Sequence, residues 1–556
     1  MIGTAVAAIA GSAAPGEKVG VIVLVGLCAA LLLTRERGAP RARAALMIAV
    51  LALAPALLVI DIWHSSQLAH LRHHPALAAG ALAAGALAVC ALSLLMRRRP
   101  QLLALLAFIA LPFRIPIAAG GSTANLLLPL YVVIGAGTLA YASILLFPGG
   151  GRLQAIMAGP SEGTGSAHPY SDYGRWRRLL TPRGLELALA AVLLLYGLQA
   201  AYSADFAKAL QNVTFFYAPF ALLFVLLRAV RWSRELLLRC LGALAGLGAI
   251  FALVGFVEYA RGRLFLNPKL IAADQYDTFF RVNSVFFDPN IYGRFLALVM
   301  IALVTALFAA RSRRLLLGLA ALLLILWGGL LTSFSESSMA ALLLGLAVLA
   351  AWRWDALTTL LVTLAGGILA LAVVLLAPAS AHFGLSGEGG SANNATSGRV
   401  RLITGGLDLF AQRPLYGYGS GSFQVEYKRH RRSDEASAVS ASHTIPVTVA
   451  AEQGIIGLLA YIALITSALF VLFQGAGRSP PRLAIAACFA ALVLHTWAYA
   501  DFLEDPSTWA LLAIGVALAR RALAQRPGTH QHGRAAGGRQ PQQSAEGFGS
   551  QLAPQT

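Results

Sequence analysis

The polar segment from about Ser391 to Glu452 holds the side chains best suited to chemistry in this chain. His443 lies just before an apolar run, and imidazole is the side chain best suited to accept a proton near neutral pH. Arg399 and Arg401 precede it, and the guanidinium group matches phosphate oxygens bidentately. This combination suits attack by a sugar hydroxyl on a glycosyl diphosphate without a metal. A purely structural role for His443 is the competing interpretation.

The polar segment stands out because most of the chain is apolar. Hydrophobic residues make up 58% of the 556 residues and charged residues 12%. Apolar runs about as long as a membrane span, roughly 20 residues, recur from end to end. The composition excludes an ordinary soluble domain. It predicts an all-α, polytopic transmembrane helical bundle of about 12–15 spans, with a large extracytoplasmic loop region that carries the site.

The apolar and polar runs divide the chain into six predicted segments. These are N-terminal transmembrane spans (1–148), a cytoplasmic linker (149–183), core transmembrane spans (184–378), an extracytoplasmic catalytic loop (379–453), C-terminal transmembrane spans (454–520) and a disordered cytoplasmic tail (521–556). The tail is rich in Gln, Gly, Pro and Ser, a composition that cannot bury enough apolar surface to fold.

Arginine clusters predict how the spans are oriented. Alternate loops carry groups such as Arg35–Arg43, Arg97–Arg99 and Arg311–Arg314. The positive-inside rule places these loops in the cytoplasm, which puts the polar segment outside the membrane. The net charge of +19 is therefore explained as a topology signal, and no nucleic-acid partner is predicted.

Two loops predicted on the outer side, 258–294 and 379–447, are also rich in basic residues, which the positive-inside rule does not explain. A phosphate or pyrophosphate ligand would explain them. For Lys428–Arg432 we prefer a solvated basic loop. We favour ligand binding for the arginines near span ends or in Gly-bounded segments, which are Arg281, Arg294, Arg399 and Arg401.

Further polar residues flank these arginines. Asp288 and Glu452 either pair with the arginines or orient His443, and simple structural pairing is the equal alternative. Pro289 and Asn290 open the next span, where they are typical of helix punctuation and capping.

Three glycines are further candidates for binding a phosphate, whereas no metal site is predicted at the outer face. Gly417, Gly419 and Gly421 would let backbone amides approach a phosphate, although glycine-rich turns are common. No acidic pattern typical of a metal site occurs at the predicted outer face, so neither metal nor cofactor is predicted.

Together, these motifs resemble the O-antigen ligase and polymerase superfamily of membrane glycosyltransferases. The match rests on RVNSVFFDPN (281–290), SFSESS (333–338), SGR (397–399), PLYGYGSGSF (414–423), His443 and EQGIIG (452–457). The resemblance covers roughly Leu185 to Arg520. Thr444 and Ile445 depart from the Asn and aromatic residue that often follow the histidine in this family.

The resemblance implies a reaction on the extracytoplasmic side of the cytoplasmic (inner) membrane. A glycan would move from undecaprenyl diphosphate to an acceptor hydroxyl, with His443 as general base and with Arg399 and Arg281 at the donor diphosphate. A lipid acceptor would make the enzyme a ligase of lipopolysaccharide type, and a carrier-linked glycan acceptor would make it a polymerase of polysaccharide biosynthesis. A protein serine or threonine is the third acceptor, and the residues leave all three open.

A transporter or flippase of polyprenyl-linked or anionic substrates is the alternative from another class. It predicts ionisable residues near span centres and broken helices at the midplane. Most acids lie at span ends instead, Glu186 and Glu336 among them. Arg114, between Pro112 and Pro116, is the feature that most favours transport, and we prefer it as support for the donor site.

Overall fold

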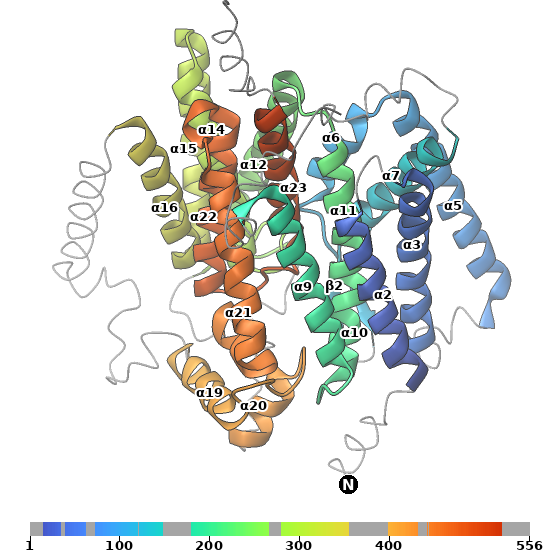
Figure 1. Cartoon of the computed structure of the whole chain (residues 1–556). Helices are drawn as coiled ribbons and strands as arrows, with labels where there is room; N and C mark the ends of the chain where they lie inside the picture. Colours follow the sequence, from blue (N-terminus) through green and yellow to red (C-terminus); the bar gives the residue numbers. More distant parts are fainter. Residues whose placement is uncertain are drawn as a thin grey trace, which may run out of the picture.

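The structure, a computed structural model, describes residues 15–34, 39–62, 73–119, 122–147, 180–265, 280–354, 399–431, 442 and 444–524. Within these ranges the chain is a bundle of helices with one short β-hairpin (Figure 1). Eleven of the described helices are long and apolar enough to cross a membrane. The predicted all-α polytopic bundle is therefore confirmed. The apolar run 357–378, which the sequence predicts to be one of the spans, lies outside the described residues.

Every other predicted span is helical. The first half contains α2 (Pro15–Leu33), α3 (Pro40–Ile62), α5 (Pro75–Arg98), α6 (Gln101–Ala110), α7 (Leu128–Leu146), α9 (Pro182–Ala200), α10 (Phe206–Asn212), the π-helical η2 (Val213–Tyr217) and α11 (Ala218–Ala229). The second half contains α12 (Arg234–Arg261), α14 (Pro289–Ala309), α15 (Arg313–Ser333), α16 (Glu336–Arg353), α19 (Arg399–Gln412), α20 (Phe423–Arg431), α21 (Ile445–Phe473), the 3-10 helix η5 (Ala476–Arg478), α22 (Pro480–Ala498) and α23 (Pro506–Ala524).

Two large apolar cores hold most of the described helices, and a small third core joins α19, α20 and α21. One large core joins α2, α3, α7, α9, α11, α21 and α23. The other large core joins α12, α14, α15, α16 and α22. Figure 1 shows α2, α3, α5 and α7 on one side of the bundle and α14–α16 on the other. Helices α9, α21 and α23 lie between them, so side chains from these helices can meet near the centre of the bundle.

Local sequence explains where several helices start. Helices α9 and α14 have proline in their first turn, where the missing N–H costs no hydrogen bond. Thr181 caps α9 by accepting a hydrogen bond from the Gly184 amide at 3.0 Å. Asp288 caps α14 by accepting one from the Asn290 amide at 2.6 Å. The predicted helix start at Pro289 is confirmed, and the cap is Asp288 and not Asn290.

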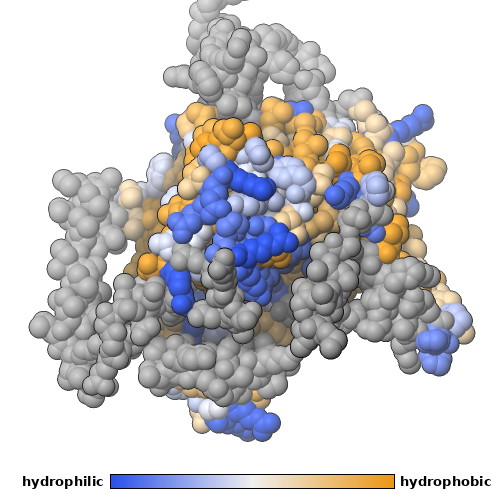
Figure 2. All heavy atoms as spheres, turned by 90° about the horizontal axis from the view of Figure 1, so that it is seen from below, coloured by the Kyte–Doolittle hydropathy of each residue, from blue (hydrophilic) through white to orange (hydrophobic). Residues whose placement is uncertain are grey.

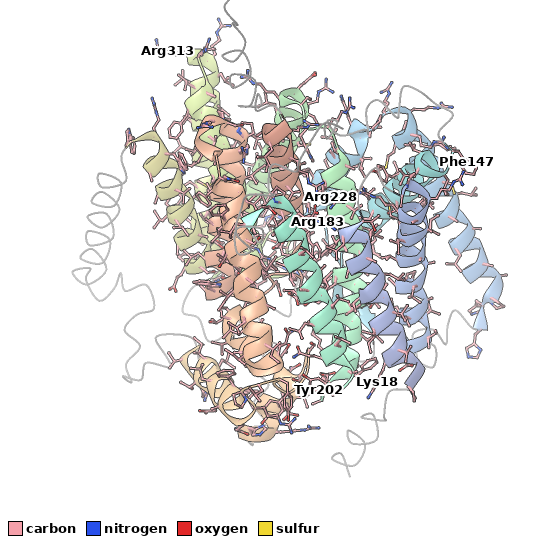
Figure 3. All side chains as sticks on the ribbon, viewed as in Figure 1. Lys18, Phe147, Arg183, Tyr202, Arg228 and Arg313 are labelled. Atoms are coloured by element: carbon pink, nitrogen blue, oxygen red, sulfur yellow. The ribbon has the colours of Figure 1, made fainter. Side chains whose placement is uncertain are left out.

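The two ends of the bundle differ in a way that follows the arginine pattern. Lys18 and Tyr202 lie at the same end as α19 and α20 (Figure 3). Phe147, Arg228 and Arg313 lie at the opposite end. Helices α19 and α20, which belong to the polar segment, therefore lie at the end of the bundle opposite to Arg313.

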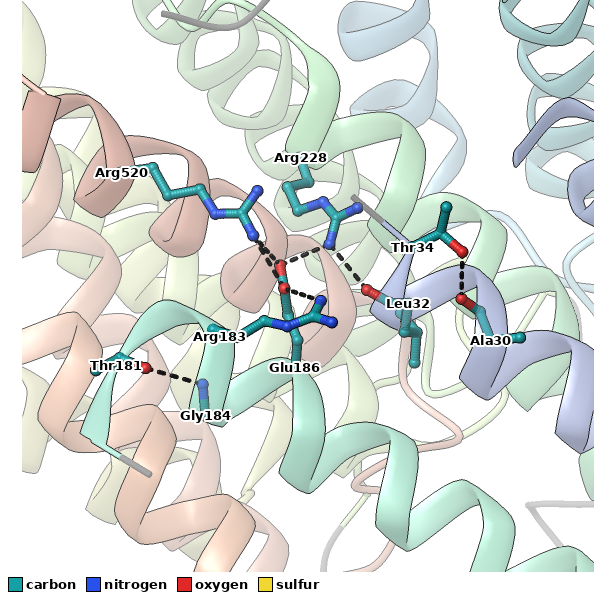
Figure 4. A network of polar contacts seen from close by, with 9 residues as sticks. All are labelled: Ala30, Leu32, Thr34, Thr181, Arg183, Gly184, Glu186, Arg228 and Arg520. Carbon is teal, nitrogen blue, oxygen red and sulfur yellow. Dashed lines mark hydrogen bonds and ion pairs between the residues drawn. The ribbon is translucent and has the colours of Figure 1, made fainter. Parts of the chain in front are cut away.

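A buried ion cluster ties helices together toward the arginine-rich end (Figure 4). The Glu186 carboxylate on α9 is fully buried and contacts Arg228 of α11 at 2.6 Å. It also contacts Arg520 of α23 at 2.7 Å and Arg183 at 3.5 Å. Arg228 donates in addition to the Leu32 carbonyl of α2 at 3.3 Å. One carboxylate thus connects α9, α11 and α23, and through Arg228 also α2.

Replacing Glu186 with glutamine should destabilise the fold. The change leaves Arg228 buried without its carboxylate, and breaking such a pair costs about 3–5 kcal/mol. Glu235→Gln is the matched control, because the Glu235–Arg239 pair is 69% and 56% exposed and is worth about 1 kcal/mol or less. Unfolding of both variants in lipid nanodiscs measures the difference. Equal losses of stability would contradict the structural role of the cluster.

Candidate functional site

Helix α21 is broken at Gly454, and a loop repairs the break. Gly454 has φ 64° and ψ −163°, which no helix residue adopts. Around this break, backbone groups of α21 form hydrogen bonds with residues 413–422 instead of with other residues of the helix. Residues 413–422 are here called the glycine loop. The exchanged bonds are Tyr418 N to Ala451 O (3.3 Å), Gly419 N to Glu452 O (2.8 Å), Ile455 N to Pro414 O (2.7 Å) and Ile456 N to Leu415 O (3.5 Å). The loop and the helix are therefore one backbone unit.

Two positions of the glycine loop require glycine because the loop backbone packs closely against other parts of the chain. Gly417 and Gly419 have φ values of +67° and +96°. A Cβ atom on Gly417 would overlap the Glu452 carbonyl, and one on Gly419 would overlap the backbone of Ser203. The amides of Gly417 and Gly419 donate to the carbonyls of Arg413 and Glu452. The interpretation that these amides approach a phosphate is therefore not what the structure shows.

Glu452 holds the loop with its side chain. Its carboxylate is buried and accepts hydrogen bonds from the amides of Gly421 at 2.8 Å and Phe423 at 3.1 Å. Phe423 is the first residue of α20, so the carboxylate satisfies a donor at that helix start. These contacts support the structural interpretation of Glu452 and involve no arginine.

A cavity of about 170 Å³, the inner cavity, lies beside this unit. It is bounded by α9, α10, η2, the first turns of α21 and residues 500–504. Its charged and amide-bearing lining residues are Arg114, Lys208, Asn212, Glu452, Gln453, Asp501 and Glu504. A π-helical segment is strained relative to an α-helix and is frequent at functional sites, and η2 contributes Phe216 and Tyr217 to this wall.

His443 and the side chain of Arg399 lie outside the described residues. The residues around His443 are nevertheless anchored. Ser442 is buried, and its amide and hydroxyl lie 3.1 and 3.0 Å from the Thr448 hydroxyl. Thr448 and Ile445, on the first turns of α21, line the inner cavity. Ser442 is thus held against α21, and Ile445, two residues after His443, lies at the inner cavity.

Arg114 reaches the inner cavity through an interrupted span. Helix α6 ends at Ala110, and the chain continues into an antiparallel hairpin of β1 (Ile115–Ala119) and β2 (Ser122–Leu126) before α7. Arg114 precedes β1 and lines the cavity. Pro112 thus lies after the end of α6, and Pro116 lies within the first residues of β1.

Arg294 and Asp288 position a wall of the cavity and do not line it. Arg294 is buried and contacts the Asp505 carboxylate at 2.5 Å. It also donates to the carbonyls of Ala500 and Asp501 at 3.4 Å. The Asp288 carboxylate accepts a hydrogen bond from the Tyr499 hydroxyl at 2.8 Å. Both residues therefore hold the loop 499–505 in place.

Arg281 and Asn290 meet in a neighbouring polar network. Arg281 donates to the Ser333 carbonyl at 3.2 Å and to the Asn290 side-chain oxygen at 3.4 Å. The Ser335 hydroxyl donates to the same oxygen at 2.9 Å. Arg401 does not join this group, because it is exposed on α19. The structure therefore distributes the predicted residues over the inner cavity, its supports and the outer helices.

Sequence reasoning missed three ionisable residues of the inner cavity: Lys208, Asp501 and Glu504. Asp501 and Glu504 belong to the run ADFLEDP directly after a predicted span, and that concentration of acids was an available signal. The Glu504 carboxylate accepts a hydrogen bond from Tyr217 at 3.0 Å. Burial raises the pKa of Glu504, and the nearby Asp501 carboxylate raises this pKa further. Glu504 therefore keeps its proton to a higher pH than a solvated glutamate.

Part of the chain is similar to a known protein family. Residues 320–462 match the family model described as O-antigen ligase. Over this segment the chain is similar to the O-antigen ligase family. The predicted resemblance to this superfamily is thereby confirmed. The matched segment runs from α15 into α21 and includes the glycine loop, His443 and Glu452. No curated protein matches the chain.

Alanine at Gly417 should destabilise the matched segment. The substitution imposes strain of about 1–3 kcal/mol at a positive φ and adds a clash with the Glu452 carbonyl. Gly246→Ala in α12 is the control, because a Cβ atom there meets nothing within 4 Å. Thermal unfolding should show a lower midpoint for Gly417→Ala only. A Gly417→Ala variant as stable as the Gly246→Ala control would refute the close packing of the loop.

Proposed function

We propose that this chain moves a glycan from undecaprenyl diphosphate to an acceptor hydroxyl on the extracytoplasmic face of the cytoplasmic membrane. The O-antigen ligase match supports an enzyme of the ligase or polymerase type. The observation that carries the proposal is the inner cavity. It lies against the first turns of α21, two residues after His443, and its wall contains Arg114 and Lys208.

The donor diphosphate is best accommodated by the basic side chains of this wall. Arg114 and Lys208 come from distant parts of the chain and line the same cavity. Cations in a partly water-excluded site stabilise the negative charge that grows on a departing diphosphate. Arg399 and Arg281 remain proposed donor-site residues. Arg294 takes a supporting role, because its contacts are to the loop 499–505.

The proposed reaction is a single displacement. His443 removes the proton from the acceptor hydroxyl, and the oxygen attacks the anomeric carbon of the donor sugar. The bond from that carbon to the diphosphate breaks, and the diphosphate departs with the electron pair. The basic residues stabilise the leaving group, so the step needs no metal. Attack opposite the leaving group predicts inversion at the anomeric carbon.

Replacing His443 with alanine should abolish transfer while donor still binds. Loss of a general base lowers rates by about 10²–10⁴-fold. The assay uses protein reconstituted in lipid, a polyprenyl-diphosphate-linked glycan and EDTA throughout. His73→Ala, at an exposed histidine outside the site, is the control and should transfer normally.

The same assay separates the competing outcomes. Normal transfer by His443→Ala would refute the proposed base. Loss of wild-type transfer in EDTA would refute metal independence. Supplying a lipid acceptor or a second carrier-linked glycan distinguishes a ligase from a polymerase. The broken helix α21 and the short α6 are also features expected of a transporter. Passage of labelled donor across the bilayer without transfer would favour that function.

A further inference from the structure

Helices α19 and α20 enclose a second cavity, here called the outer cavity. Its volume is about 330 Å³, within the range of small-molecule sites, about 300–1,000 Å³. It shares no lining residue with the inner cavity. The molecule seen from below, the side on which α19 and α20 lie, carries a hydrophilic patch bordered by apolar side chains (Figure 2). The outer cavity is therefore a separate polar feature of this face.

One wall of the outer cavity is held rigid by hydrogen bonds. The Tyr418 hydroxyl donates to the Gln412 side-chain oxygen at 2.9 Å and lies 3.3 Å from His430 Nε2. His430 Nδ1 lies 2.9 Å from the Glu426 carbonyl. The Arg413 guanidinium covers the Tyr418 ring at 4.4 Å. The side chains of Gln412 and His430 are thus fixed before any ligand arrives.

The lining residues of the outer cavity include a hydrogen-bond donor, hydrogen-bond acceptors and an aromatic ring. Asp408 lies one helical turn before Gln412, on the same face of α19, and both line the cavity. Because Tyr418 binds the Gln412 oxygen, the amide nitrogen of Gln412 is left as a hydrogen-bond donor. The two carboxylate oxygens of Asp408 are acceptors with about four lone-pair sites between them. Tyr427 adds aromatic carbon and is stacked on Phe423, with ring centroids 5.7 Å apart.

This combination matches a sugar. Each sugar hydroxyl is both donor and acceptor, and the C–H face of the ring packs on aromatic carbon. The lining residues of the outer cavity that the structure describes include no Lys or Arg beside the Asp408 carboxylate, which disfavours a diphosphate, and the polar lining disfavours a lipid chain.

The glycine loop connects the two cavities. Gly421 lines the inner cavity, and Tyr418, three residues earlier, supports the outer one. The two cavities thus lie on parts of one loop that are only three residues apart. We propose that the outer cavity is a glycan subsite that binds a sugar unit remote from the point of transfer. This proposal rests on the proposed glycan transfer, and it predicts that the enzyme favours long glycans over a single repeat.

The test compares donors that carry one repeat unit and many. Asp408→Ala/Gln412→Ala should raise KM for the long donor about tenfold, because two hydrogen bonds to the remote sugar are lost. The same variant should transfer the one-repeat donor like wild type. Lys428→Ala, exposed on α20 outside the cavity, should leave both donors unchanged. The milder Asp408→Asn variant should fold and show a smaller effect of the same kind.

Two results would overturn the subsite. Unchanged KM for the long donor is one, and equal loss for both donors in a folded variant is the other. Binding of the free, carrier-less oligosaccharide, measured by calorimetry on the intact protein, separates this proposal from the transfer reaction. If the wild type transfers neither donor but binds the oligosaccharide, and Asp408→Ala/Gln412→Ala binds it more weakly, the subsite stands and glycan transfer fails. Equal binding by the two proteins contradicts the subsite.

Discussion

The exchange of backbone hydrogen bonds at Gly454 is the constraint on which the site depends. A helix broken inside a membrane protein exposes carbonyls and amides that cost several kcal/mol each if they stay unpaired. The carbonyls of Ala451 and Glu452 accept from the glycine loop, and that of Gln453 accepts from the Gln199 side chain at 3.2 Å. The break is therefore stable only with the loop and α9 in place.

The repaired break determines the geometry of both cavities. The glycine loop must lie against α21, and this places Gly421 at the inner cavity and Tyr418 behind the outer one. Glu452 serves the same assembly through its contact with the start of α20. A change in the helix break would consequently move the proposed transfer site and the proposed glycan subsite together. The ion cluster around Glu186 fixes α9, α11 and α23 toward the opposite end and so stabilises the frame that carries them.

Sequence alone could predict the helices, because apolar runs and flanking arginines are local signals. It also predicts the helix start at Pro289, where proline opens α14. It could not predict that the amides of Gly417 and Gly419 contact protein, because that depends on a kink in a distant helix. The pairing of Arg294 with Asp505 was equally hidden, since the two residues are far apart in the chain.

The central claim is that the inner cavity holds the donor diphosphate. The most direct test is an experimental structure of the protein with a polyprenyl-diphosphate-linked glycan bound. The account predicts the diphosphate within hydrogen-bonding distance of Arg114 and Lys208, with the anomeric carbon facing His443. A diphosphate bound elsewhere, with the inner cavity unoccupied by donor, would contradict it.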